Sequence, residues 1–400
     1  MKLTFNQRDC LEWAVSETIG LEPFRARICG SKPLNIKLGI DPTSPNIHLG
    51  RTIPLWRLRA FQSLGHHIHL IIGSFTAQIG DTSDKESERP MLTSDQVRAN
   101  MQPYLAQIWR ILDPLRQDQV HIHYNDEWLS PLTLGQISSL ADHFSVNAFI
   151  KRELVAKRLE SGGRVSLREM LYPLMQGYDS LVVEADIEIG GTDQRFNLLA
   201  GRALQEGALR TPQGIIMNTL VAGTDGRKMS SSWGNVISLL DQPEEMFGKT
   251  MSIPDSLIGE YLNFLPFCVQ PFSLLELQNY LEDGANPRDL KLQLASCITG
   301  LYYSEATAQA AKEAFQRQFT DQKPTEELRF SDENFPLQLL DIITTKTNWS
   351  ESRSELRRVF LAGGIELDNQ KIFDYHHLLE ATSLPVTLKV GKRILVQLVR

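Results

Sequence analysis

The sequence predicts an α/β protein in which helices cover an open, mostly parallel β-sheet, followed by a helical segment and a small α+β module. An alternating segment at 34–40 precedes a helical repeat that ends near Gly65, and a second apolar segment follows at 69–73. Strand, helix and strand in this order favour a parallel sheet. After residue 222 the repeat is helical for about a hundred residues, and about sixty residues after it are enough for a small domain.

The expected sheet begins with Leu34 to Ile40, where every second residue is apolar. The turn DPTSPN follows at 41–46, and a helix begins at Leu49. Further strands are expected at 120–124, 186–189 and 215–221, with helical stretches between them. Such a Rossmann-like sheet binds ligands at the carboxyl ends of its strands.

These patterns divide the chain into four parts. The sheet domain spans 1–222 and contains a mostly helical connecting segment at about 128–175. A helical domain at 223–322, a polar linker at 323–336 and an α+β module at 337–400 follow.

Composition excludes several classes of protein. Of the 400 residues 42% are hydrophobic and 22% charged, which is typical of globular proteins, and no long apolar run is present for a membrane span. The first residues lack the apolar core of a signal peptide. The cysteines at 10, 29, 268 and 297 are scattered singly, which indicates reduced thiols in a cytoplasmic protein and no zinc site.

The charge is unevenly distributed. A net charge of −7 argues against a nonspecific nucleic-acid coater, but residues 337–400 carry nine Lys/Arg against seven Asp/Glu. The basic end of the chain is therefore compatible with one local RNA contact.

The segment Gly39 to Arg51, GIDPTSPNIHLGR, is a strand end, a turn and the start of a helix. Such a helix start offers unpaired N–H groups to a phosphate. His48 and Arg51 lie three apart and can face one side, while Gly50 leaves the backbone accessible. The tripeptide HLG alone occurs often by chance, so its position after GIDPT is what makes it informative.

A second segment, Lys228 to Ser232 (KMSSS), supplies one ammonium and a run of hydroxyl groups after a turn-rich stretch. By itself it is equally compatible with a solvated loop.

A third pattern, Tyr172, Gln176 and Asp179, has helical spacing and can share one helix face. Spacing alone would favour a solvated face or a cap, because buried amides and acids need partners.

The first two segments, in this order, resemble the HIGH and KMSKS motifs of class I aminoacyl-tRNA synthetases. With GIDPT and the third pattern, the chain resembles the tyrosyl-tRNA synthetases. Arg51 departs from the family, which usually has a second histidine, and Ser231 stands where many members have a second lysine. The resemblance implies these catalytic residues: His48, Arg51, Lys228, Ser231 and Ser232.

The resemblance also implies the binding residues. The tyrosine amino group would contact Tyr172, Gln176 and Asp81, and its phenol hydroxyl Asp179. Lys37 replaces an aromatic residue that touches this hydroxyl in many members. The full tyrosine set is Lys37, Asp41, Asp81, Tyr172, Gln176, Asp179 and Gln194. Residues 190–194 resemble the family's GGSDQ loop, and the ATP set is Gly39, Thr43, His48, Gly50, Gly191, Asp193, Lys228, Met229 and Ser230.

The end of the chain resembles the S-four-like RNA-binding domain of bacterial members of this family. Ser352 and Glu355 have the spacing of a capping box that opens a basic helix. The expected RNA contacts are Arg353, Arg357, Arg358, Lys392 and Arg393. The alternative is a small α+β module with solvated arginines.

The resemblance implies a tyrosine–tRNA ligase that uses ATP with Mg²⁺ and has no metal bound by protein side chains. Its partners would be tyrosine, ATP, the tRNA for tyrosine and a second copy of the chain. The connecting segment would form much of that dimer interface, although an ordinary crossover is the alternative. The competing functions are a tryptophanyl-tRNA synthetase and a noncatalytic RNA-binding relative.

Overall fold

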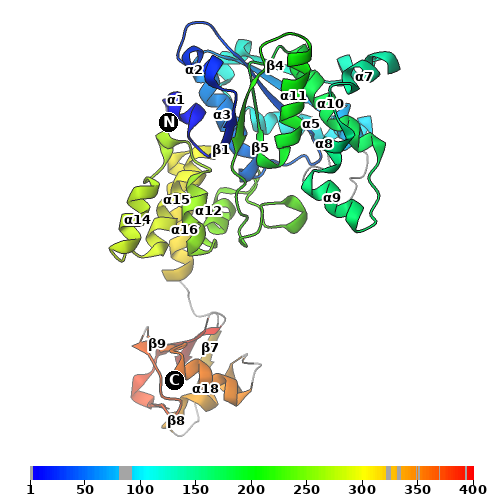
Figure 1. Cartoon of the computed structure of the whole chain (residues 1–400). Helices are drawn as coiled ribbons and strands as arrows, with labels where there is room; N and C mark the ends of the chain where they lie inside the picture. The colour runs from blue at the N-terminus through cyan, green and yellow to red at the C-terminus, as the bar shows by residue number, and fades with distance from the viewer. Residues whose placement is uncertain are drawn as a thin grey trace. The chain divides into compact units, whose positions relative to one another are not determined.

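The structure is a computed structural model that describes residues 3–80, 92–320, 326–330, 335–347, 349, 352–368, 370–391 and 394–400 (Figure 1). The chain forms two compact units, 1–312 and 313–400, each with its own hydrophobic core. The two units are described separately below.

The sheet of the first unit has the strand order β1-β6-β5-β2-β3-β4. Neighbouring strands are parallel except β1, which pairs antiparallel with β6. This confirms the predicted α/β class and adds an edge strand, β1, that the sequence pattern did not indicate. The bounds are β1 Val15–Ile19, β2 Asn35–Ile40, β3 His67–Ile72, β4 Val120–Tyr124, β5 Ile187–Gly191 and β6 Gly214–Asn218.

The helices that position the site are α3 and α10, which cover opposite faces of the sheet (Figure 1). Helix α3, Leu49–Ser63, is followed closely by Gly65, whose positive φ of 93° suits glycine. Helix α10, Leu167–Val182, begins with a complete capping box between Ser166 and Glu169. Helix α11, Arg195–Gly207, packs along α10.

The other helices of the first unit surround this core. They are α1 Gln7–Leu11, α2 Glu22–Ile28, α4 Thr76–Ile79, α5 Ser94–Ile108, α6 Asp126–Leu129, α7 Leu134–Ala141, α8 Val146–Ile150, α9 Glu153–Glu160, α12 Pro243–Met251, α13 Ile258–Leu262, α14 Leu274–Glu282, α15 Pro287–Tyr302 and α16 Glu305–Thr320. None of the helices in the described part of the chain combines the length and apolar character that a membrane crossing requires.

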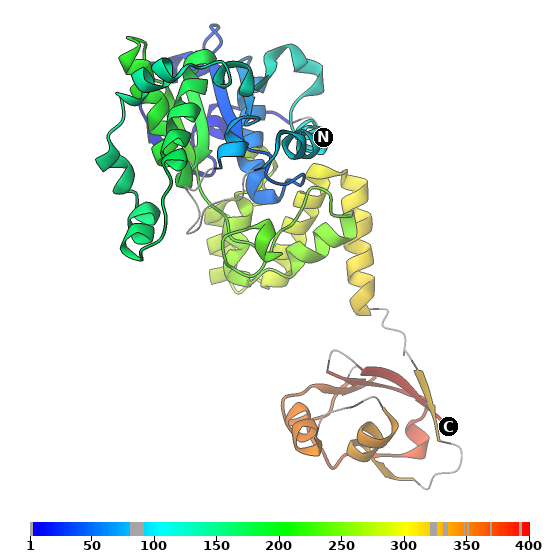
Figure 2. The same ribbon diagram turned by 90° about the vertical axis from the view of Figure 1, so that its right-hand side faces the viewer.

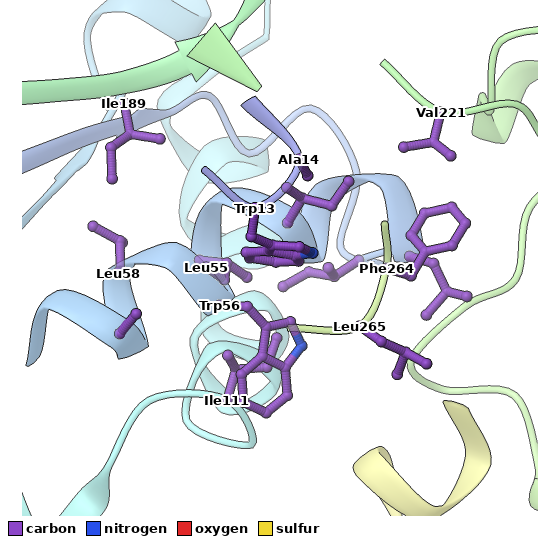
Figure 3. Packing of buried hydrophobic residues seen from close by; sticks show 14 of the residues in the cluster. Trp13, Ala14, Leu55, Trp56, Leu58, Ile111, Ile189, Val221, Phe264 and Leu265 are labelled. Atoms are coloured by element: carbon purple, nitrogen blue, oxygen red, sulfur yellow. The ribbon is translucent and has the colours of Figure 1, made fainter. Parts of the chain in front are cut away.

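The hydrophobic core of this unit runs without interruption from the sheet into the later helices. Figure 3 shows Trp13 and Trp56 near Phe264 and Leu265. The indole Nε1 of Trp56 also donates to the hydroxyl of Tyr302 at 2.9 Å. Residues 223–312 of the helical domain expected at 223–322 therefore pack as part of the sheet unit, and the helices α12, α13 and α15 share one core with α3.

The second unit is a small α+β module (Figure 2). Its main sheet has the order β10-β9-β12-β13-β7, and β8 pairs with β11. The bounds are β7 Glu326–Arg329, β8 Leu337–Gln338, α17 Leu339–Lys346, α18 Arg353–Leu361, β9 Ile365–Leu367, β10 Gln370–Lys371, β11 Leu378–Leu379, β12 Val386–Val390 and β13 Ile394–Val399.

Part of the expected linker at 323–336 is folded. Residues 326–329 form β7, which pairs in parallel with β13. The polar composition of the segment concealed this strand, because an edge strand can keep polar side chains on its solvent face. The module therefore begins earlier than residue 337.

Candidate active site

The site lies where the strand order reverses. From β2 the chain proceeds to β3 and β4 on one side, whereas from β5 it proceeds to β6 on the other. Asp41 follows β2, and residues 192–194 follow β5, which pairs with β2. The two predicted loops therefore meet at the switch point of the sheet, where open α/β sheets bind their ligands.

The first turn of α3 contacts the KMSSS loop. The N–H of Gly50 points at Met229 Sδ at 3.4 Å, and the N–H of Leu49 donates to the carbonyl of Ile237 at 2.9 Å. A Cβ on Gly50 would lie 3.2 Å from the His48 ring and 3.7 Å from Met229 Sδ. The structure thus brings together two motifs that are far apart in the sequence, and glycine permits the close approach.

His48 precedes α3 and its side chain does not cap the helix. Burial, together with the positive charges of Arg51 and Lys228, lowers the pKa of His48 to about 3. The imidazole is therefore neutral at physiological pH. Its Nδ1 atom is buried and lacks a hydrogen-bond partner among the described residues. A neutral ring with an unused nitrogen suits hydrogen bonding to a nucleotide.

The KMSSS loop is anchored at its base and exposed at its tip. The N–H of Met229 donates to the carbonyl of Val221 at 3.1 Å, and the N–H of Ser230 donates to Asn235 Oδ1 at 2.9 Å. Ser231 and Ser232 are exposed. Their hydroxyl groups are thus accessible to a ligand from solvent.

Lys228 joins this loop to the loop after β5. Its Nζ lies 3.3 Å from Asp193 Oδ2, and the two side chains are only partly buried. Gly191, before Asp193, could not carry a side chain without clashing with it, because a Cβ there would lie 2.4 Å from Asp193 Oδ1. A cation and two loop ends therefore converge beside the start of α3, which suits an oligophosphate.

Helix α10 directs the third motif toward the sheet. The hydroxyl of Tyr172 donates to Asp41 Oδ2 at 2.9 Å, and Thr76 Oγ1 donates to Asp41 Oδ1 at 2.8 Å. Gln176 Nε2 donates to Glu188 Oε1 at 3.1 Å. The shared face that the spacing of Tyr172, Gln176 and Asp179 suggested is therefore present and partnered.

Asp179 is buried with 3% of its surface exposed. Its Oδ1 accepts a hydrogen bond from Trp128 Nε1 at 2.8 Å, and its Oδ2 accepts one from Asn125 Nδ2 at 3.4 Å. Burial raises the pKa of Asp179 to about 7, against the lowering effects of Lys37, Trp128 and Asn125. A carboxylate can accept about four hydrogen bonds, so capacity remains for a ligand donor.

Sequence reasoning missed Asn125, Trp128 and Glu188, which all contact the predicted residues. Asn125 and Trp128 lie just after β4, where polar residues at a strand end could have marked a site. The signal for Glu188 was an acidic residue inside the apolar strand IEIG.

The remaining predicted residues differ in their surroundings. The ammonium of Lys37 is fully buried against Glu188, away from solvent. The N–H of Thr43 donates to the carbonyl of Asp41 at 2.8 Å, and Gln194 Oε1 accepts from Asn197 Nδ2 at 2.9 Å. A Cβ on Gly39 would meet open space. Thr43 and Gln194 lie just after β2 and β5, whereas Lys37 lies within β2.

Two further observations concern this unit. Asp81 lies outside the described residues. A surface hollow of about 470 Å³ between α5 and α6 includes Ser74 and Asp126 but none of the predicted tyrosine or ATP residues. The motif contacts, and not this hollow, therefore mark the candidate site.

The connecting segment at 128–175 exposes apolar side chains. Leu134 and Leu167 are about four-fifths exposed, and Val146 and Leu159 are also exposed. Clusters of exposed apolar residues on a globular protein commonly mark an interaction surface. Arg158 and the buried Glu169 form an ion pair that ties α9 to α10.

In the second unit, α18 carries three of the predicted RNA-binding residues. Arg353 pairs with Asp341 at 2.7 Å, Arg358 pairs with Glu355 at 2.9 Å, and Arg357 lies 5.2 Å from the ring centre of Tyr375. Both ion pairs are exposed and therefore weak enough for a phosphate to displace. Ser352 caps this helix as predicted by accepting from the N–H of Glu355. Lys392 and Arg393 lie outside the described residues.

An open parallel sheet with a HIGH-like helix start against a KMSSS loop defines the class I aminoacyl-tRNA synthetases. The sequence model of that family, described as tRNA synthetases class I (W and Y), matches residues 30–320.

Two named relatives show which family within this class the chain resembles. The chain is 42% identical to the tyrosine–tRNA ligase of Carboxydothermus hydrogenoformans, over 93% of this chain and 92% of that protein. It is 39% identical to the tyrosine–tRNA ligase of Thermotoga maritima, over 95% and 94% respectively. The chain belongs to the tyrosyl-tRNA synthetase family.

Solved structures agree on the fold. The tyrosyl-tRNA synthetase of Archaeoglobus fulgidus complexed with L-tyrosine has a TM-score of 0.60 at 21% identity, covering 76% of this chain and 98% of that chain. A truncated mitochondrial tyrosyl-tRNA synthetase of Coccidioides posadasii also has a TM-score of 0.60, at 19% identity, covering 77% and 90%. At these identities the comparison supports the Rossmann-like fold alone.

Proposed function

We propose that this chain is a tyrosine–tRNA ligase. In the first step tyrosine and ATP give enzyme-bound tyrosyl-adenylate and pyrophosphate, and in the second the tyrosyl group passes to the 3′ end of its tRNA. The observation that carries the proposal is the buried Asp179, held by Trp128 and Asn125 beside the switch point of the sheet. The relatives named as tyrosine–tRNA ligases support it.

For the first step, an oxygen of the tyrosine carboxylate attacks the α-phosphorus of ATP, and the bond from that phosphorus to the pyrophosphate oxygen breaks. The protein contributes positioning and charge stabilisation. The neutral His48 and the N–H groups at the start of α3 would hold the nucleotide. Lys228, Ser231 and Ser232 would bind the departing pyrophosphate, while Gly191 and Asp193 face the ribose.

The substrate tyrosine would lie between α10 and the sheet. Its phenol hydroxyl would donate to Asp179, and its ammonium would contact Tyr172, Gln176 and Asp81. Asp41, already held by Tyr172 and Thr76, would complete this end of the pocket. Phenylalanine would be rejected because it would leave the buried Asp179 without its partner.

Two positions depart from the family pattern. Arg51 would replace the second histidine with a permanent guanidinium charge, and Ser231 would replace a second lysine with a hydroxyl. The magnesium ion that accompanies ATP would supply charge neutralisation to the triphosphate. We assign that ion to the nucleotide, because Asp193, the carboxylate next to the loop, is paired with Lys228, and the other groups that converge there are hydroxyls and N–H groups.

The second step requires the tRNA. The basic face of α18, with Arg353, Arg357 and Arg358, would contact its phosphates, together with Lys392 and Arg393. The exposed apolar residues of the connecting segment would form a homodimer interface. The four cysteines are free thiols, which is consistent with a location in the cytoplasm.

The test is tyrosine-dependent exchange of pyrophosphate into ATP. We expect exchange with tyrosine and much slower exchange with tryptophan, which separates this function from that of a tryptophanyl enzyme. Folded protein that binds tRNA without any exchange would instead support the noncatalytic RNA-binding alternative.

A further inference from the structure

A buried ion pair lies under the proposed tyrosine pocket. Lys37 on β2 and Glu188 on β5 face each other in register, with Nζ 2.9 Å from Oε1, and both side chains are at most 1% exposed. Transferring two charges from water into a protein interior is costly unless every polar atom finds a partner. A central strand of a parallel sheet normally carries apolar residues, so this pair requires an explanation.

The ammonium of Lys37 has no N–H left for a ligand. Besides Glu188, it donates to the backbone carbonyl of Gln176 at 2.8 Å and to Ser180 Oγ at 2.7 Å. An ammonium has three donors, and these three acceptors occupy them. In this arrangement Lys37, which the resemblance places among the tyrosine-binding residues, acts on the phenol only through other residues.

Glu188 completes the network from the sheet side. Its oxygens accept from Gln176 Nε2 and Ser180 Oγ, both at 3.1 Å, and from Gln213 Nε2. The pair thus holds α10 to the sheet at Gln176 and at Ser180. Asp179 lies between these two anchor points, next to Ser180.

We infer that Lys37 and Glu188 are positioning residues of the tyrosine pocket, which fix Gln176 and Asp179 on α10 and whose opposite charges act in opposite directions on the Asp179 carboxylate that would meet the phenol. The inference rests on the proposed function, because it takes Asp179 as the group that meets the substrate hydroxyl. Lys37 then acts on the substrate indirectly, and Glu188, which the sequence did not indicate as a site residue, acts with it.

The electrostatics around Asp179 support this role. Lys37 lowers the pKa of Asp179 and Glu188 raises it, while the hydrogen bonds from Trp128 and Asn125 lower it. Removing one partner of the ion pair should therefore shift the titration in one direction, and removing the other should shift it in the opposite direction.

Other charged groups around the pocket act less directly. On β3 and β4, burial and neighbouring histidines, His121 above all, lower the pKa values of His69 and His123, while Glu127 raises that of His123. Both pKa values lie below the ordinary one for histidine, so both rings are mainly neutral at pH 7. On α11, Arg195 is paired with Glu17 and Arg202 with Glu206. The carboxylate of Asp41, after β2, accepts hydrogen bonds from Tyr172 of α10 and from Thr76 of α4.

The experiment measures KM for tyrosine in the exchange reaction as a function of pH, for the whole protein and three variants. Lys37→Met removes the cation, Glu188→Gln removes the anion, and Lys37→Met/Glu188→Gln removes both. We expect the pH below which KM rises to move up by about one unit in the first variant and down by about one unit in the second. In the double variant this pH should return toward its value in the unaltered protein.

Glu12→Gln, which removes an exposed carboxylate paired with Arg8 on α1, is the matched control and should leave the pH profile in place. Thermal unfolding identifies variants that fail to fold. If Lys37→Met is unfolded, the other two variants still test the inference. In Glu188→Gln the pH below which KM rises must move down, and in the double variant it must return toward that of the unaltered protein. Equal shifts in one direction, or no shift in folded variants, would overturn it.

Asp179→Asn separates this inference from the function on which it rests. An unchanged KM for tyrosine in that variant would refute both the proposed pocket and the inference. A raised KM in that variant, together with unmoved profiles in the ion-pair variants, would overturn only the inference.

Discussion

At the scale of single residues, we propose that recognition of the substrate depends on a carboxyl group that is almost entirely buried. Burial makes ionisation of Asp179 costly, and two hydrogen bonds together with the charge of Lys37 offset part of that cost. A phenol hydroxyl adds a further donor to the ionised group. Such a site favours tyrosine over phenylalanine because the buried acceptor is satisfied by only one of them.

The pKa of Asp179, near 7, predicts a pH effect on tyrosine binding. The carboxyl group gains a proton as the pH falls through about 7, and the neutral acid accepts a hydrogen bond from phenol less strongly. We expect KM for tyrosine to rise about tenfold for each pH unit below that pKa. KM for ATP, measured in the same exchange assays, should stay nearly constant. A tyrosine KM that does not change between pH 5 and 8 would contradict this prediction.

At the scale of elements, the start of α3 and the KMSSS loop are in contact although they are distant in the sequence, and we propose that they form one nucleotide site. Gly50 and Met229 are in contact, and Lys228 reaches the loop after β5. The loop KMSSS carries one ammonium, so in the proposed function Lys228 bears most of the stabilisation of the pyrophosphate that this loop provides.

Lys228→Ala should slow formation of the adenylate on the order of 100-fold, because it removes a preorganised charge at the departing group. KM for tyrosine should change little, since Lys228 lies at the nucleotide end of the site. Single-turnover measurements of adenylate formation would check the rate. A variant in which KM for tyrosine rises and the rate is retained would show that Lys228 has another role.

At the scale of the whole molecule, the connecting segment and the second unit supply two surfaces beyond the catalytic site. The exposed apolar side chains of the connecting segment predict a dimer. Leu167→Glu, which replaces one of the exposed apolar side chains of this segment with a charge, should convert dimers to monomers in sedimentation experiments. Leu115→Glu, an equally exposed position outside the segment, is the control and should leave the dimer intact. Dimers in both variants would exclude this interface.

The second surface predicts a salt-dependent contact with tRNA. Arg357→Ala should weaken tRNA binding and reduce the slope of log affinity against log salt by about 1, because one phosphate contact is lost. Arg25→Ala, an exposed arginine of α2 paired with Glu22, should not alter the slope. Filter binding over a range of salt concentrations measures both. Equal slopes for all three proteins would argue against a contact through α18.

The sheet and the motif positions could be predicted because their signals are local. Alternating residues identified β2, and the glycine and histidine of the α3 start lie within a few residues of each other. Edge strand β1 was missed because its half-buried residues alternate weakly. Strand β7 was missed because its pairing partner, β13, lies some seventy residues later.

The candidate site was predictable only where one segment carried the pattern. Tyr172, Gln176 and Asp179 share one helix, so spacing placed them together. Asn125, Trp128 and Glu188 come from other elements, and only the fold brings them to α10. The role expected for Lys37 depended on which acceptors surround it, and no sequence pattern specifies those three acceptors.

A crystal structure of the protein with bound tyrosine tests the central claim most directly. We predict that the phenol oxygen lies about 2.5–3.0 Å from a carboxylate oxygen of Asp179, with Lys37 still bonded to Glu188. A tyrosine whose hydroxyl points to solvent or to another acidic residue, leaving Asp179 without contact, would contradict it.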